Sequence, residues 1–171
     1  MIRLLFTASS GLVSDSIRVL TGQGVTHVGI QTSLNLVLSA EWPCVVEQSL
    51  PKFMAGRYLV AAYEATPEGE KHLMLSRARA HIGDKYAATE IPGFVLARLW
   101  RRLTGRAIKN PTHDPHKEIC SEFVLYLDDE TGFSTEFIGL DPETTSPGDI
   151  LARLQTGGPT FRGVDGSAPH K

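Results

Sequence analysis

The stretch that most constrains this chain is His116-Lys-Glu-Ile-Cys-Ser-Glu-Phe-Val-Leu-Tyr-Leu127, because it places a cysteine where a loop becomes a helix. Residues 120, 123, 124 and 127 follow the i, i+3, i+4, i+7 spacing and are expected to share one apolar helix face. Cys120 is therefore expected in the first helical turn, where free backbone N–H groups and the helix dipole favour a thiolate. A lone cysteine that begins a buried helix is more often a small core residue, so this pattern alone assigns no chemistry.

Composition bounds the class of protein. The 171 residues are enough for one packed domain, and 42% hydrophobic with 21% charged residues is ordinary for a globular protein. A net charge of −2 gives no general attraction to nucleic acid. The two cysteines, Cys44 and Cys120, are too few for a disulfide framework. No apolar run has the length of a signal peptide or a transmembrane span, so we expect a cytoplasmic protein.

Strand patterns precede helix patterns along the chain, which predicts an α+β fold. Strands are expected at residues 2–7, 25–31, 35–41, 44–50 and 57–64. Helices are expected at residues 13–20, 67–82, 91–103, 120–131 and 145–154. The residues after 155 are rich in glycine and proline without an apolar period. We therefore expect one domain over residues 1–155 and a flexible, dispensable tail over residues 156–171.

Three residues have the side chains that a cysteine hydrolase needs: a thiol, an imidazole that takes and returns its proton, and a group that orients the imidazole. His27 lies on the strand 25–31, Glu41 ends the next strand, and Cys120 begins a helix. If the two strands pair antiparallel, His27 and Glu41 face the same side and the helix packs across it. Glu47, inside the following strand, is not expected to take the role of Glu41. Taken singly, a strand histidine is more often structural and a glutamate at a strand end is more often solvated.

Five short segments resemble the permuted branch of the NlpC/P60 superfamily, which is papain-like. They are Thr26-His-Val-Gly-Ile30, Ser39-Ala-Glu41, Gly83-Asp-Lys-Tyr86, Ile119-Cys-Ser-Glu-Phe-Val124 and Ser146-Pro-Gly-Asp-Ile-Leu151. In that branch the histidine strand precedes the nucleophile helix, as His27 precedes Cys120 here. The resemblance implies a circularly permuted papain-like fold, with an antiparallel sheet packed against the helix that carries the nucleophile.

The resemblance also implies roles for single residues. Cys120 matches the nucleophile, His27 the base and Glu41 the residue that orients the imidazole. Tyr86 matches a tyrosine that lines the site, and we add Ser121 and Trp100 as candidate substrate contacts. Relatives often carry an acidic residue after this tyrosine, and here Ala87 takes its place.

The implied function is a cysteine hydrolase, an amidase or peptidase, that cleaves an amide or ester carbonyl through an acyl-thioester without a cofactor. Cell-wall peptide fragments are the first substrate class, and lipid acyl groups, by hydrolysis or acyl transfer, are the second. The alternative is a catalytically idle papain-like module that binds or assembles with a partner. The segment His113-Asp-Pro-His116 has no second histidine or cysteine pair at zinc-site spacing, so no metal is expected.

Overall fold

In the described part of the chain, six strands form one antiparallel sheet with the order β4-β3-β2-β1-β5-β8. This computed structural model describes residues 2–9, 24–66, 71–86, 96, 100, 103–105 and 117–164. The strands of the sheet are β1 (Arg3–Ser9), β2 (His27–Gln31), β3 (Leu36–Ala40), β4 (Val45–Ser49), β5 (Arg57–Ala65) and β8 (Phe161–Gly163). The helices are α2 (Leu50–Phe53), α3 (Lys71–Ala80), α5 (Cys120–Thr131) and α6 (Pro147–Gln155). The predicted α+β class is confirmed.

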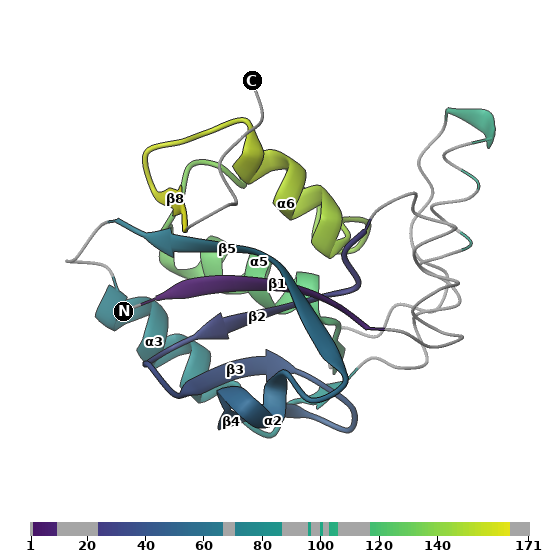
Figure 1. The fold of residues 1–171 in the computed structure, drawn as a ribbon. Helices are drawn as coiled ribbons and strands as arrows, with labels where there is room; N and C mark the ends of the chain where they lie inside the picture. The colour runs from purple at the N-terminus through teal and green to yellow at the C-terminus, as the bar shows by residue number, and fades with distance from the viewer. Residues whose placement is uncertain are drawn as a thin grey trace.

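Helices cover one face of the sheet, where Figure 1 shows α5 behind β1 and β5, and the short helix α2 lies on the other face. Alternating residues of β1, β2 and β3 join side chains of α3, α5 and α6 in the main core, and Met74, Phe123 and Leu127 are among its members. The other face carries a smaller cluster of Leu5, Val37, Phe53 and Ala62, with Phe53 supplied by α2. The sheet is therefore buried on both faces over its middle strands.

A β-bulge in β5 changes which face its first residues occupy. Phe6 of β1 lies opposite Ala61, but the next residue, Thr7, lies opposite Leu59, so Val60 is the extra residue. Side chains alternate between the faces of a sheet, and one inserted residue reverses the alternation beyond it. Arg57, opposite Ser9, consequently shares a face with Thr7 and with Thr7's other partner, His27.

The predicted helices at the C-terminal side have the expected ends. α5 begins at Cys120, where Glu122 Oε2 accepts the Ile119 N–H at 3.0 Å, and it ends at Gly132, whose φ of 59° is the left-handed conformation that glycine adopts readily. α6 begins after Ser146, whose hydroxyl oxygen accepts the Asp149 N–H.

The predicted helix 67–82 is confirmed over residues 71–80. The predicted helices at 13–20 and 91–103 lie almost wholly outside the described residues. No helix within the described ranges combines the length and apolar character needed to cross a membrane.

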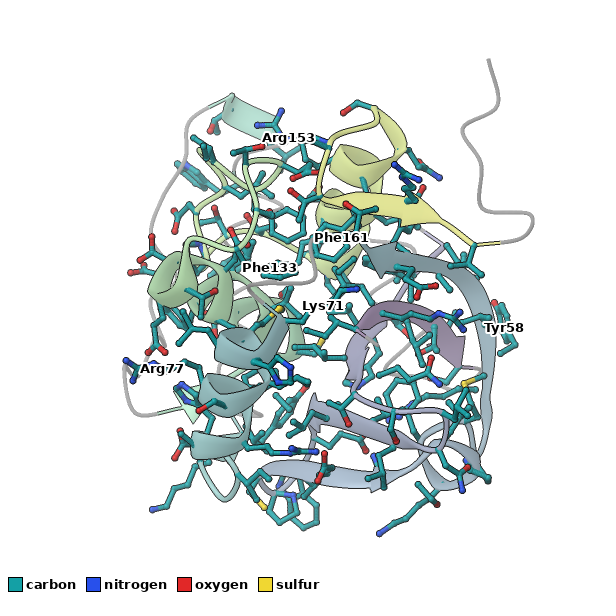
Figure 2. The ribbon with its side chains drawn as sticks, turned by 90° about the vertical axis from the view of Figure 1, so that its left-hand side faces the viewer. Tyr58, Lys71, Arg77, Phe133, Arg153 and Phe161 are labelled. Atoms are coloured by element: carbon teal, nitrogen blue, oxygen red, sulfur yellow. The ribbon has the colours of Figure 1, made fainter. Side chains whose placement is uncertain are left out.

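The expectation of a flexible tail from residue 156 is wrong for residues 156–164. β8 pairs with β5, with Phe161 opposite Ala65, and Val164 donates its N–H to Ala62 O at 2.9 Å. Phe161 is 4% exposed, and Figure 2 shows it meeting Phe133, with ring centroids 5.8 Å apart. Glu136 Oε1 accepts the N–H groups of Thr160 and Phe161 at 2.6 and 3.2 Å. A strand of three residues is too short to show an alternating pattern, so periodicity could not predict it.

Gly29 is the one residue of β2 for which space decides the residue type. A Cβ atom there would lie 2.7 Å from Phe53 Cε2 and 3.0 Å from Val37 Cγ1. Only glycine leaves room here for the Phe53 ring, whose centroid lies 5.6 Å from that of the His27 ring.

We therefore expect Gly29→Ala to lower the free energy of unfolding by about 1–3 kcal/mol, the usual cost of overpacking a core. Urea denaturation measures this change. Gly24→Ala is the matched control, because a Cβ atom at Gly24 meets nothing within 4 Å. Equal stability of the two variants would show that Phe53 does not need the space above Gly29.

Candidate active site

Cys120 lies at the place where β2 and β3 stop pairing. The two strands are joined through Ile30–Leu38 and Gln31–Val37, and that register, continued, sets His27 opposite Glu41. The Val28 N–H, beyond the last of these pairs, donates to the Cys120 sulfur. The first residue of α5 thus meets the open end of the strand pair, and the predicted set of Cys120, His27 and Glu41 comes together from three separate segments.

The predicted side of approach of the helix is wrong. Val28 and Ile30, together with Leu38 and Ala40 of β3, pack with α5 in the main core, whereas the His27 ring lies beside Phe53 of α2 on the opposite face. Neighbouring residues of a strand, such as His27 and Val28, point to opposite faces, and the sequence did not show which face the helix would cover. Cys120 reaches His27 because both lie at the end of the sheet rather than over its middle.

His27 is 9% exposed, and its Nε2 lies 3.7 Å from Glu41 Oε1, just beyond hydrogen-bonding distance. Burial acts to lower the pKa of His27, because it disfavours the imidazolium. The charge and hydrogen bond of Cys120, followed by Glu41, outweigh burial and raise the pKa of His27 to about 9. The imidazole is therefore protonated at neutral pH.

Cys120 has the opposite balance. Burial acts to raise the pKa of the thiol, but the charge and hydrogen bond of His27 and the N–H groups of Val28 and Ser121 outweigh it and hold the pKa below the ordinary value. Cys120 and His27 each stabilise the ionised form of the other. Both shifts favour a thiolate–imidazolium pair, which is the form of nucleophile that cysteine chemistry requires.

Glu41 accepts three hydrogen bonds at one oxygen. Its Oε1 receives Ser39 Oγ at 2.9 Å, Gln48 Nε2 at 2.7 Å and Arg57 Nη1 at 2.8 Å. Burial acts to raise the pKa of this carboxyl, but His27 and Arg57 outweigh burial and hold it well below its usual range. Glu41 is thus a fixed negative charge beside the imidazole. Glu47, by contrast, pairs with Arg79 at 3.1 Å and accepts the Thr32 hydroxyl at 3.0 Å.

Tyr86 is joined to the same site through a small parallel sheet. β6 (Lys85–Tyr86) pairs with β7 (Lys117–Glu118), so Tyr86 lies opposite Glu118, two residues before Cys120. Burial, followed by the charges of Cys120 and Glu41, raises the pKa of Tyr86. The phenol therefore keeps its proton, which makes it a hydrogen-bond donor at the site. The segment Gly83-Asp-Lys-Tyr86, one of those that carry the resemblance, ends in this short strand.

The other predicted residues are placed differently. Ser121 is fully buried, and its backbone N–H, rather than its hydroxyl, contacts the Cys120 sulfur. Trp100 is 47% exposed, and no described contact joins it to the site. Cys44 is half-buried and forms an isolated bridge with Lys85. Both thiols are free. Ala87 and the segment His113–His116 lie outside the described residues.

The sequence did not single out the residues that surround Glu41. Ser39 and Gly29 belong to the segments that carry the resemblance, but Gln48, Phe53 and Arg57 come from elements with no motif. Ser39 lies on β3 and Gln48 on the neighbouring strand β4. Only the register of the two strands, with Val37 opposite Gln48, shows that Gln48 can reach Glu41. The position of Arg57 on the face of Glu41 depends on the bulge at Val60, which the sequence pattern does not reveal.

Within the described residues, no group of three or more histidine, cysteine, aspartate or glutamate side chains is placed to hold a metal ion. No family model matches the sequence, and no curated protein is significantly similar to it. A crystal structure described as the metalloprotein YiiX from Escherichia coli O157:H7, DUF1105, superposes with a TM-score of 0.50 at 13% identity. The superposition covers 95% of this chain and 94% of that one, so the two chains are similar in fold over nearly their whole length.

Proposed function

We propose that this protein is a cysteine-dependent hydrolase of amide or ester carbonyls, built on a circularly permuted papain-like fold of the NlpC/P60 type. The observation that carries the proposal is the contact of Cys120 with His27, whose pKa values move in the directions that make a thiolate and an imidazolium. A cysteine that served only the core would gain nothing from a buried imidazole and two backbone N–H donors. The order His27, Glu41, Cys120 along the chain supports the permuted form.

In the proposed reaction, the Cys120 thiolate attacks the carbonyl carbon, and the carbonyl oxygen becomes an oxyanion. The backbone N–H of Cys120 is available to stabilise that oxyanion, because the first N–H groups of a helix have no partner within the helix. The His27 imidazolium gives its proton to the leaving amine or alcohol, and a thioester remains. Neutral His27 then takes a proton from water, the resulting hydroxide attacks the thioester, and the thiolate is released.

Glu41 and Tyr86 have supporting roles in this proposal. Nε2 of His27 faces Glu41, which leaves Nδ1 for the thiol, and the fixed negative charge of Glu41 favours the imidazolium. The protonated phenol of Tyr86 is available to donate a hydrogen bond to a substrate bound at Cys120. Cell-wall peptides are the first substrate class in the proposal, and lipid acyl esters are the second. The proposal requires a reducing compartment in which the thiol stays free.

A panel of amides, acyl esters and peptidoglycan fragments tests the proposal. Wild-type protein should release product from one of these classes, Cys120→Ala should not, and Cys44→Ala should match the wild type. Mass spectrometry of a slow ester substrate should detect an acyl group on Cys120 alone. Turnover that survives Cys120→Ala would reject the proposal. An unreactive thiol, with no thiolate at neutral pH, would favour the alternative of an idle binding module.

A further inference from the structure

We propose that Arg57 is a positioning residue of the Cys120–His27 pair, which holds the Glu41 carboxylate at the edge of hydrogen-bonding distance from the imidazole. The inference rests on the proposed function and adds a residue that controls how strongly the imidazole holds its proton.

The bulge at Val60 is what brings Arg57 to the site. If Phe6–Ala61 pairing continued without it, Ser9 would lie opposite Tyr58 and the Arg57 side chain would fall on the α5 face of the sheet. With the extra residue, Arg57 lies opposite Ser9 on the face of Thr7 and His27. Bulges are common next to active sites, where they redirect one side chain.

The guanidinium is held by three contacts. Arg57 Nη1 donates to Glu41 Oε1 at 2.8 Å and to Phe53 O at 2.9 Å. Its Cζ lies 5.0 Å from the centroid of the Phe53 ring, and the His27 ring also contacts that ring. A planar group with two hydrogen bonds and an aromatic contact has one orientation, and it fixes the carboxylate with which it pairs.

The Glu41 oxygen that lies nearest His27 Nε2 in the ion pair, Oε1, already accepts three hydrogen bonds. Ser39, Gln48 and Arg57 all donate to Oε1 at 2.9 Å or less, while His27 Nε2 stays 3.7 Å away, buried and without a hydrogen-bond partner among the described residues. Arg57 is the only cation among these three donors. It therefore competes with the imidazolium for the same oxygen.

The charged and titratable groups facing His27 come from three elements: Cys120 of α5, Glu41 after β3 and Arg57 of β5. Tyr86 of β6 faces Cys120 and Glu41 and stays neutral. The thiolate and the carboxylate both favour the imidazolium, whereas Arg57 opposes it. Removing Arg57 would delete the opposing charge and release Glu41 toward Nε2, and both changes strengthen the hold of His27 on its proton.

The test is an NMR titration of the His27 imidazole in wild type, Arg57→Gln and Glu41→Gln, with His27→Asn to assign the resonance. Arg57→Gln should raise the His27 midpoint by about one pH unit, at the low end of what a neighbouring charge does. Glu41→Gln should lower the midpoint. Arg3→Gln is the matched control, because Arg3 forms an equivalent ion pair with Glu64 at 2.9 Å elsewhere on the β1–β5 pair, and its midpoint should equal the wild type.

Superimposed titrations of wild type and Arg57→Gln would overturn the inference. If Arg57→Gln does not fold, Arg57→Lys tests the same point, because its single nitrogen lacks the planar fork: a midpoint above the wild type supports the inference and an equal midpoint rejects it. Failure of the proposed function looks different. In that case wild-type His27 itself would titrate near its ordinary value of about 6.5, whatever stands at position 57.

Discussion

Truncation after Gln155 should cost the protein most of its stability. It removes β8 and with it the burial of Phe161 against Phe133 and Phe137, whose ring centroids lie 5.8 and 5.7 Å from that of Phe161. Loss of one buried phenylalanine alone typically costs about 3–5 kcal/mol. The truncation also removes the Thr160 and Phe161 N–H groups, which donate hydrogen bonds to the buried Glu136 carboxylate. The total approaches the ~5–15 kcal/mol that stabilises a whole domain.

Thermal melting followed by circular dichroism measures this loss. A second truncation, after Val164, keeps β8 and is the matched control, so the difference between the two shortened chains belongs to residues 156–164. Phe161→Ala in the full chain should lower the melting temperature by roughly 6–20 °C, since 1 kcal/mol corresponds to about 2–4 °C at this chain length. Equal melting temperatures for both truncations and the full chain would show that β8 does not contribute to the fold.

The two outcomes at the C-terminal side show what periodicity can detect. α6 was predictable, because Ser146-Pro147 is a helix start and the apolar residues after it have helical spacing. β8 was not, because a strand of three residues, one of them a glycine, carries no period. Its stability comes from partners distant in the chain: Ala65 for the backbone of Phe161, and Glu136 with Phe133 for the rest. Such a strand is specified by the surface that receives it.

The candidate site likewise contains residues that the sequence could predict and residues that it could not. The thiol, imidazole and carboxylate could be predicted, because each has a residue type suited to one role and a place at the end of an element. The sequence left their pairing conditional, and the observed register of β2 with β3, continued, places His27 opposite Glu41. Arg57 could not be predicted, since a regular strand would turn it to the other face and only the irregular pairing at Val60 corrects this. The side on which α5 packs also needed the three-dimensional structure.

Replacing His27 by alanine should lower the rate of Cys120 alkylation by iodoacetamide at about pH 6 by about 10- to 100-fold. Without the imidazolium, burial of the thiol is opposed only by the N–H groups of Val28 and Ser121, so its pKa should rise toward that of an ordinary thiol. At about pH 6 the thiolate fraction then falls to roughly one part in several hundred or less. The loss in rate is smaller than the loss in thiolate, because a thiolate of higher pKa is intrinsically more nucleophilic.

Cys44 is the internal reference for this experiment. It is half-buried while Cys120 is 5% exposed, so access favours Cys44 and ionisation favours Cys120. Peptide mapping of the alkylated protein gives both rates from one sample. Faster labelling of Cys120 than of Cys44 in the wild type, reversed by His27→Ala, is the expected pattern. If the alkylation rate of Cys120 is the same in wild type and in His27→Ala, the two side chains do not act together.

The most direct measurement of the thiolate–imidazolium pair is the ultraviolet absorbance of the Cys120 thiolate, recorded against pH in folded Cys44→Ser protein. Subtraction of the same titration of the Cys44→Ser/Cys120→Ser double variant removes the tyrosine signal. Because contact with His27 lowers the pKa of Cys120 and raises that of His27 to about 9, the thiolate should already be present at neutral pH and should persist as the pH rises. Thiolate absorbance that develops only above about pH 8.5, as for an ordinary thiol, would contradict the pair and with it the proposed hydrolase.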